Sequence, residues 1–328
     1  MGNQAVRRSL AVALALLTTL CAVRAVAQSS DYPNRLVTIV APSAPGGLYS
    51  LFARIIGNKL EQRFGKTFVV ENRPGAAGNI GAEVVFTAEP DGYTLLASSP
   101  SPLAINQWLY KKLSYDPAGF QPIAMMSRIP NVLVVRKDFP AASVQEAIAY
   151  LKDNPGKVSF GSQGVGTASH LTGTMLMKLT GTSMVHVPYK GTAPILTDII
   201  AGHIDLTFIQ VSSAYVMHAA GKARILALAT DKRLDFLPDV PTLAEVGLPI
   251  STDTWNAISA PPKTPAAIVA KLNAAVNAAL KQPDVRQRLR DLKTVIGGDS
   301  GPAEAAKFVE TERRQWGELV HAAGLVPQ

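Results

Sequence analysis

Twice along this chain, a short apolar run leads through a glycine-rich turn into an amphipathic helical pattern. The first copy places the run Leu36–Ala41 before Gly46 and Gly47, and the second places Val158–Phe160 before Gly161–Thr167. The first run, apolar except for one threonine, is typical of a strand buried in a parallel sheet, and the second is a shorter strand candidate. Each copy therefore predicts a βα unit with a tight turn at the carboxyl end of its strand.

The same alternation of β-rich runs and helical patterns continues along most of the chain and predicts an α/β fold built on mostly parallel sheets flanked by helices. Further strands are expected at Phe68–Glu71, Thr94–Ala97, Ile123–Met126, Asn131–Arg136, Met184–Val187, Leu206–Ile209, Ile225–Ala229 and Trp255–Ala260. Two capping boxes, Ser143–Glu146 and Thr242–Glu245, predict helix starts. Thr264 followed by Pro265 predicts an N-cap and a first helical residue. The rest of the chain is expected to be helical, with a break near Gly297-Gly298.

Two sets of βα units without a low-complexity linker predict two lobes joined by strands that cross between them. The crossings are expected near Ser127–Asn131 and Ser251–Trp255. Residues 28–126 and 253–328 would form one lobe, and residues 127–252 the other. Residues 1–27 have the basic start, apolar centre and A-x-A end of a signal peptide, so cleavage is expected at Ala27–Gln28 and the mature chain in the periplasm.

Composition narrows the possible partners and chemistry. Cys21 is the only cysteine and lies in the predicted signal peptide, so a mature chain would have no disulfide and no thiol chemistry. The formal charge of +8 falls to +5 without the three arginines of that segment. The basic residues are scattered, which argues against nucleic acid, and the mild positive balance favours anionic solutes. A monomer is expected.

Both glycine-rich turns suit an anion, because glycines let the backbone approach a ligand and the helix that follows presents free N–H groups. A plain tight connection explains the first turn equally well. The second turn nearly matches G-x-G-x-x-G, but Ser169 replaces the last glycine and no acidic residue follows at the required distance, which argues against a dinucleotide. Its neutral side chains, Ser162, Gln163, Thr167 and Ser169, can bind an anion without a countercharge.

The sequence predicts no catalytic residues, no metal and no cofactor. The five histidines show no metal-ligand spacing, and no nucleophile motif or carboxylate pair is evident. His170 beside the second turn is interpreted as making a structural hydrogen bond. Trp255 fits either ligand stacking or core packing, and Tyr189 at a strand end can donate a hydrogen bond.

A series of short motifs resembles the Bug family, the periplasmic solute receptors of tripartite tricarboxylate transporters. The motifs are Ala44–Gly47, Val70–Gly78, Pro90–Leu96, Gly164–Leu171, His186–Gly191, Leu237–Thr242 and Ala244–Gly247. They occur in order and cover essentially the whole mature chain. The resemblance implies a type II periplasmic binding protein that closes its two lobes on a small carboxylate and delivers it to membrane permease subunits. A dicarboxylate and an aromatic acid are the candidate ligands.

The resemblance also implies ligand-binding roles for Gly47, Asn79, Ser99, Gly166, Thr167 and Asp205, the last more on the lobe surface than in direct contact. With the residues of the two turns, the expected site comprises Ser43, Gly46, Gly47, Tyr49, Ser50, Asn79, Ser99, Gln163, Gly166, Thr167, Ser169, Tyr189, Asp205 and Trp255. This chain has Ser43 where the family usually has an aromatic residue, and Ser50 where it usually has an aspartate. A hydrolase and a signalling receptor are the alternative functions. The hydrolase would need a nucleophile–base pair, and the receptor would use the same closure.

Overall fold

A computed structural model describes residues 31–230, 232–297, 299–322 and 324–327 of the chain. The predicted signal peptide and its cleavage site lie outside the described residues. Ten strands form one sheet in the order β2-β1-β3-β9-β4-β7-β5-β6, and β8 and β10 both pair with β4. Strands from both halves of the chain thus share one hydrogen-bonded framework.

Lobe 1 denotes residues 31–130 and 253–327, and lobe 2 denotes residues 131–252. Lobe 1 contains β1 (Val37–Ala41), α2 (Leu48–Phe64), β2 (Phe68–Asn72), α3 (Asn79–Phe86), β3 (Thr94–Ser98), β9 (Asp253–Ala260), α8 (Ala266–Leu280), α9 (Pro283–Asp291), β10 (Val295–Ile296) and α10 (Pro302–Ala322). Lobe 2 contains α4 (Val144–Asp153), β5 (Ser159–Ser162), α5 (Ala168–Thr180), β6 (Val185–Pro188), α6 (Thr192–Ala201), β7 (Leu206–Gln210), α7 (Val211–Ala219) and β8 (Ala223–Ala229). Strand β4 (Gln121–Arg136) runs through both. Short helical turns lie at Ala76–Gly78, Ser101–Ile105, Asn106–Trp108, Pro117–Gly119 and Ala244–Val246.

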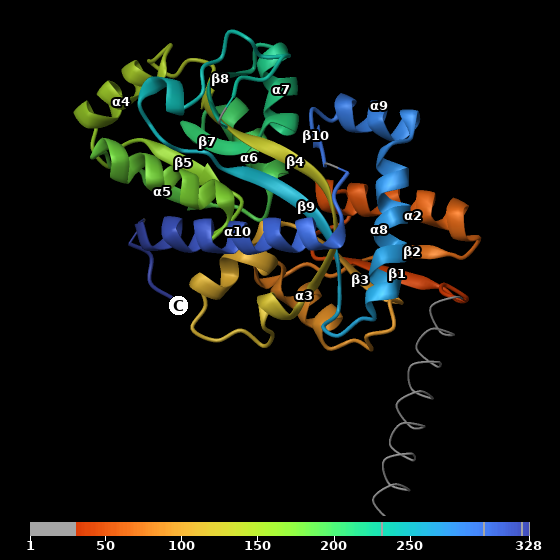
Figure 1. Cartoon of the computed structure of the whole chain (residues 1–328). Helices are drawn as coiled ribbons and strands as arrows, with labels where there is room; N and C mark the ends of the chain where they lie inside the picture. The colour runs from red at the N-terminus through yellow and green to blue at the C-terminus, as the bar shows by residue number, and fades with distance from the viewer. Residues whose placement is uncertain (1–30, 231, 298, 323, 328) are drawn as a thin grey trace, which may run out of the picture.

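Parallel pairing dominates the outer part of each lobe, and antiparallel pairing dominates where the lobes meet. Strand β1 pairs in parallel with β2 and β3, and β5 pairs in parallel with β6 and β7. Strand β4 pairs antiparallel with β9 in lobe 1 and continues into the other lobe (Figure 1). The predicted α/β class with mostly parallel sheets flanked by helices is confirmed.

The sequence predicted two separate strands where the structure has the single strand β4. Its first part pairs with β9, and from Asn131 onward it pairs with β7 and β8. Pro130, which has no N–H to donate, stands at this change of partners, where a missing ladder bond costs little. The changes of partner at Asn131 and Asp253 lie close to the predicted lobe boundaries, which stay a prediction as domain boundaries.

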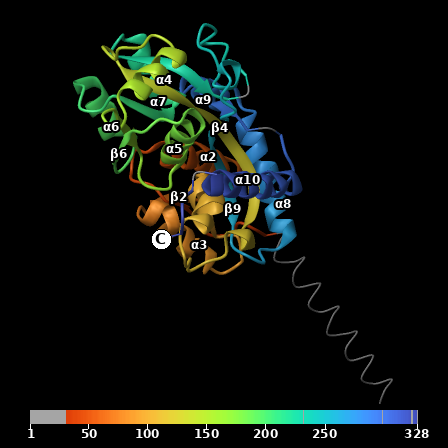
Figure 2. The same ribbon diagram turned by 90° about the vertical axis from the view of Figure 1, so that its left-hand side faces the viewer.

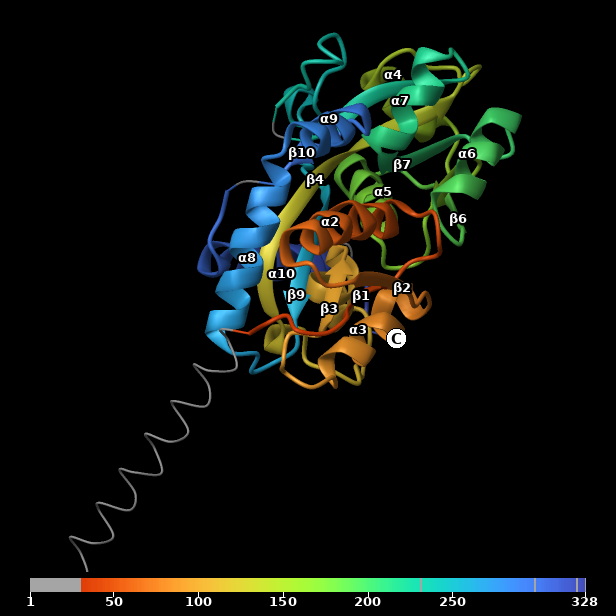
Figure 3. The same cartoon turned by 90° about the vertical axis from the view of Figure 1, so that its right-hand side faces the viewer.

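Helices cover both faces of the sheet in each lobe. In lobe 1, α2 and α8 share one apolar cluster with β1 and β3, while α3 and α10 pack in another cluster on the other face. Figure 3 shows α2 above β1 and β3 in that view. In lobe 2, α6 and α7 join the first cluster, and α4 and α5 pack in a third. Figure 2 views α10 nearly along its axis, below α5 of the other lobe.

Both predicted capping boxes form. The Ser143 hydroxyl accepts a hydrogen bond from the Glu146 N–H, and the Thr242 hydroxyl accepts one from the Glu245 N–H. The second box opens only the short turn Ala244–Val246. The predicted cap at Thr264 is wrong: α8 begins at Ala266 with Pro265 in the cap position, and the Thr264 hydroxyl donates to the Pro261 carbonyl instead. The last segment is also more broken than expected, because Pro283 starts a separate helix and β10 follows it.

Candidate functional site

The turn after β1 brings the start of α2 to the carboxyl edge of the lobe 1 sheet. Gly46 has a left-handed φ of 80°, and Gly47 occupies the N-cap position, where an added Cβ would lie 3.1 Å from the Ala44 carbonyl oxygen. No side chain caps α2, and its first turn has no acidic residue. The N–H groups that open a helix have no intrahelical acceptor, so this end of α2 carries positive potential suited to an anion.

Tyr49, in the first turn of α2, reaches toward the boundary between the lobes. Its hydroxyl lies beside those of Ser99, just after β3, and Thr254, on β9. Burial raises the pKa of Tyr49, and the two neighbouring hydroxyls oppose that rise only in part. The phenol is therefore neutral at physiological pH and available to donate a hydrogen bond.

The glycine-rich turn after β5 is held by several internal hydrogen bonds. The Thr167 hydroxyl donates to the Gly164 carbonyl at 2.7 Å and also caps α5, accepting from the N–H of His170 at 3.5 Å. The Gly166 N–H donates to Nδ1 of His170 at 3.2 Å. Ser169 is fully buried, and its Oγ has no hydrogen-bond partner in the part of the chain that the structure describes. A buried hydroxyl without a protein partner is unusual and is the kind of group that an ordered water molecule satisfies.

A chain of neutral amide and hydroxyl groups connects this turn to the first. Nε2 of Gln163 donates to Oε1 of Gln210 at 2.8 Å and to the Thr192 hydroxyl. Nε2 of Gln210 lies 3.5 Å from the Thr254 hydroxyl, which is also the neighbour of Tyr49. Groups from β7, α6 and the turn after β5 in lobe 2 thus meet groups from α2 and β9 of lobe 1.

Several residues of the predicted site lie elsewhere within lobe 1. The fully buried Ser50 donates to Oδ1 of Asn72 on β2 at 3.2 Å. Oδ1 of Asn79 accepts from Asn106 at 2.6 Å and from the Tyr115 hydroxyl at 2.7 Å. Both side chains are thus engaged inside the lobe, beneath the first turn and at the start of α3. Ser43, in the turn after β1, has a buried Oγ with no hydrogen-bond partner among the described residues.

Three more predicted residues point away from the lobe boundary. The Tyr189 hydroxyl donates to Asp198 on α6 at 2.6 Å. The Asp205 carboxylate accepts from the N–H and the hydroxyl of Ser159 and from Nε of Arg136, at the amino ends of β5 and β7. Trp255 is fully buried, its ring packs against α10 and its Nε1 donates to Glu312 at 2.6 Å. Of its two interpretations, the structure places Trp255 in the core.

Two histidines contact the second turn and the end of β5 that leads into it. The rings of His170 and His186 stack with centroids 4.2 Å apart, and Phe160 stacks on His186 at 4.7 Å. Burial lowers the pKa of His170 to about 4, with a further contribution from His186, and burial also lowers the pKa of His186. Both rings are neutral at pH 7. The predicted structural hydrogen bond of His170 is the one it accepts from Gly166.

Ser162 and His186 form a pair that the sequence did not reveal. Oγ of Ser162 lies 2.6 Å from Nε2 of His186, which is the distance of a nucleophile and its base. The register of β5 and β6, which places Phe160 opposite His186, creates this contact. Ser162 is 0% exposed, so a substrate carbonyl cannot reach its hydroxyl. The pair holds the turn in place instead of attacking a substrate.

Gln210, Thr192 and Thr254 were also missed. Gln210 is the last residue of β7, and the carboxyl ends of parallel strands are where ligands bind in α/β sheets, so its position was a usable signal. Thr254 lies one residue before Trp255 in the predicted crossing. Across the described ranges, no three or more His, Cys, Asp or Glu residues gather as a metal would require. Those ranges also contain no helix that is long and apolar enough to cross a membrane.

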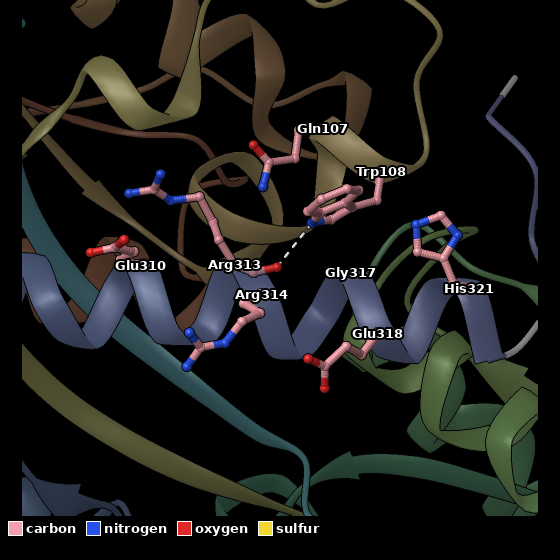
Figure 4. A pocket seen from close by; sticks show the side chains of 8 residues that line it. All are labelled: Gln107, Trp108, Glu310, Arg313, Arg314, Gly317, Glu318 and His321. Carbon is pink, nitrogen blue, oxygen red and sulfur yellow. Dashed lines mark hydrogen bonds between the residues drawn. The ribbon is translucent and has the colours of Figure 1, made fainter.

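A shallow pocket of about 360 Å³ lies apart from these groups, between the turn Asn106–Trp108 and α10 (Figure 4). Trp108 covers Gly317 there, and Nε1 of Trp108 donates to the Arg313 carbonyl at 3.0 Å. Its remaining lining residues are Gln107, Glu310, Arg314, Glu318 and His321. The two arginines and two glutamates balance in charge, so this pocket does not select an anion.

Comparison with known proteins places this geometry among periplasmic receptors. Residues 52–325 match the family described as the tripartite tricarboxylate transporter family receptor. The structure of Rpa4515 from R. palustris with adipate is similar, with a TM-score of 0.85, 36% identity and coverage of 91% of this chain and 100% of that one. The periplasmic binding protein BugD gives a TM-score of 0.82 at 34% identity, covering 90% and 100%. MatC from Rhodopseudomonas palustris with bound malate gives 0.81 at 34% identity, covering 88% and 100%.

Proposed function

Because this chain belongs to the family of tripartite tricarboxylate transporter receptors, we propose that it binds a small organic carboxylate between its two lobes and delivers it to a membrane permease. Members of this family are periplasmic solute receptors and not enzymes. The proposal therefore concerns the ligand, the place where it binds and the partner that receives it.

The observation that carries the proposal is the chain of neutral donors between the two turns. Tyr49, Thr254, Gln210 and Gln163 connect the uncapped start of α2 with the turn before α5. None of these side chains is charged, so an anion placed among them would be held by N–H and O–H dipoles. Helix starts and hydroxyl groups stabilise a carboxylate well in such a setting, without a countercharge.

A small dicarboxylate is the ligand class we propose first. Two similar receptors were solved with adipate and with malate, which both carry two carboxylates on a short aliphatic chain. Two helix starts on opposite sides of the lobe boundary, those of α2 and α5, offer one positive end for each carboxylate. A ligand with two anionic groups can use both turns, and a monocarboxylate can use only one.

A thermal-shift screen followed by isothermal titration tests the proposal. The panel contains adipate, malate, further mono-, di- and tricarboxylates, and aromatic acids. At a concentration near 100 Kd, binding adds about 2.7 kcal/mol to the free energy of unfolding. A protein of this size then melts several degrees higher, at roughly 2–4 °C per kcal/mol.

Adipamide is the matched control for adipate, because it keeps the chain length and replaces both carboxylates by neutral amides. We expect a dicarboxylate of the panel to raise the Tm and the corresponding diamide to leave it unchanged. If no carboxylate raises the Tm, the ligand class is wrong. If the diamide stabilises the protein equally, the site does not recognise negative charge.

Export and delivery complete the proposal. N-terminal sequencing of the protein from a periplasmic fraction should give Gln28 as the first residue, as the predicted signal peptide requires. Deletion of the gene should abolish uptake of the labelled ligand by intact cells. Retained uptake with lost induction of a ligand-responsive gene would instead make this protein a signalling receptor.

A further inference from the structure

Leu109 of lobe 1 covers the glycine-rich turn of lobe 2. A Cβ added at Gly166 would lie 2.4 Å from Cδ1 of Leu109, and two further carbons of the leucine lie within 4.0 Å. Leu109 is almost fully buried, at 9% exposure. It shares one apolar cluster with Ala168 and Leu171 at the start of α5. Lobe 1 therefore packs an apolar side chain directly on the turn proposed to bind the ligand.

The segment that carries Leu109 is firmly held within lobe 1. The ring of Trp108 packs on Gly317 of α10, where a Cβ would lie 2.6 Å from the ring, and its Nε1 donates to the Arg313 carbonyl (Figure 4). On the other side, Nδ2 of Asn106 donates to Asn79 at 2.6 Å and to the Ala77 carbonyl at 3.2 Å. These contacts fix Leu109 relative to α10 and α3 and leave its side chain facing the other lobe.

The turn that receives Leu109 is fixed as well. Its Gly166 N–H donates to Nδ1 of the stacked His170, and the Thr167 hydroxyl donates to the Gly164 carbonyl, so the backbone of the turn is held by internal hydrogen bonds. Gly166 has a φ of 80° and no side chain, which leaves the space that Leu109 fills. Two rigid surfaces from different lobes thus meet at one apolar contact.

We propose that Leu109 is a closure latch: its contact with Gly166 stabilises the closed arrangement of the lobes and so raises ligand affinity without touching the ligand. Opening of the lobes would separate the two surfaces and return the leucine side chain to water. The measured affinity of a receptor falls in proportion to the fraction of molecules in the binding-competent state, so loss of the latch weakens binding. This inference rests on the proposed function only for its affinity readout.

The first test measures lobe separation without ligand. Spin labels at Val69→Cys and Val185→Cys, in a Cys21→Ser background, report the distance between the exposed edge strands β2 and β6 of the two lobes. We expect Leu109→Ala to raise the ratio of open to closed molecules roughly tenfold, the scale of exposing a leucine side chain. Leu113→Ala is the matched control, because Leu113 belongs to lobe 1, packs against the same cluster and is only partly buried.

The second test separates the latch from a general loss of stability. Gly166→Ala should also open the lobes, because its new Cβ collides with Leu109. If that collision is the cause, Gly166→Ala should have a smaller effect in the Leu109→Ala background, where Cδ1 is absent. Purely additive effects would mean that the two residues do not act through this contact.

The third readout is the affinity for adipate, measured by titration. We expect Leu109→Ala to raise the Kd roughly tenfold and Leu113→Ala to change it less than twofold. If the parent protein does not bind adipate or any other acid, the proposed function is wrong. The spin-label distances, which need no ligand, still test whether Leu109 stabilises the closed lobes. The latch is overturned if Leu109→Ala and Leu113→Ala give the same distances and the same affinity.

Discussion

The two glycine-rich turns have the same order of elements but are supported differently. The turn before α2 has no side-chain cap, and an added Cβ at Gly46 would meet nothing within 4 Å. The turn before α5 is capped by Thr167, hydrogen-bonded to His170 and covered by Leu109. Gly46 and Gly166 share a φ of 80°, so the contrast arises from their surroundings and not from the backbone.

This contrast indicates that the two turns contribute different interactions to ligand binding. The first turn leaves the start of α2 without a side-chain cap, so the helix contributes positive potential. Tyr49 adds a neutral hydroxyl that can donate a hydrogen bond. The second turn is fixed in shape and contributes placed N–H groups, the buried Ser169 hydroxyl and the contact with the other lobe. Substitutions in the second turn should therefore act through geometry, and substitutions in the first should act through charge and single hydrogen bonds.

The largest effect is expected from Gly166→Val, which should abolish carboxylate binding. The left-handed φ strains a β-branched residue by about 1–3 kcal/mol, and the side chain also collides with Leu109. Gly46→Val is the matched control, with the same φ and open space around it. Urea unfolding of the ligand-free proteins should show a larger loss for Gly166→Val, and titration should show no binding. Affinity within a few-fold of the parent would mean that the ligand does not use the second turn.

Acid should weaken the second turn through the histidine stack. The pKa of His170 is about 4 in the folded protein and near 6.5 when unfolded, so the folded state binds fewer protons between these values. The part of the free energy of unfolding that depends on neutral His170 is fully present above about pH 6.5. It is lost as the pH falls toward 4, by about 3 kcal/mol in all. Urea unfolding at pH 7 and pH 4.5 measures this loss. His170→Gln removes this titrating ring and should lose less; an equal loss in both proteins would exclude His170 as the cause.

Ser50→Asp should weaken binding of the native ligand by about 1–3 kcal/mol, the scale of a like-charge interaction between the new carboxylate and a ligand anion at modest dielectric. Ser50 lies in the first turn of α2, so an aspartate there would cancel part of the positive potential offered to an anion. Ser50→Asn is the uncharged control. Titrations at low and high salt should show the loss shrinking as salt rises. Equal or tighter binding by the aspartate variant would show that the ligand brings no negative group near α2.

Tyr49→Phe should have the smallest effect, about 1 kcal/mol of binding free energy, because it removes a single hydroxyl beside Ser99 and Thr254. Tyr189→Phe makes the same chemical change at a hydroxyl that faces Asp198 in lobe 2. Titration should show weaker binding only for Tyr49→Phe. If the order is reversed, Tyr189 belongs to the site and Tyr49 does not.

Periodicity and turn residues were enough to predict the α/β class, most strands and both capping boxes, because these features depend on neighbouring residues. The single long β4 could not be read in this way. Pro130 is a local signal for a break, yet the strand continues because its partners change there from β9 to β7 and β8. Only the assembled sheet provides those partners.

The groups of the candidate site that follow a turn could be marked from the sequence, and those that depend on strand register could not. Tyr49, Gln163, Thr167 and Ser169 stand beside glycines that mark the turns in the sequence. Gln210 and Thr254 carry no such mark and meet only because β4 brings β7 and β9 to its two sides. Asp205 was expected in the ligand-binding set, but it lies at the amino ends of β5 and β7, opposite the ends that carry the turn. Its position in the sequence does not reveal this.

A crystal structure of the protein with adipate, or with the tightest-binding acid of the panel, tests the central claim most directly. The account predicts carboxylate oxygens within hydrogen-bonding distance of the N–H groups that open α2 and α5, with the Tyr49 hydroxyl or Gln163 amide completing the contacts. Clear density for the acid in the pocket beside Trp108 and α10, and none between the lobes, would contradict it.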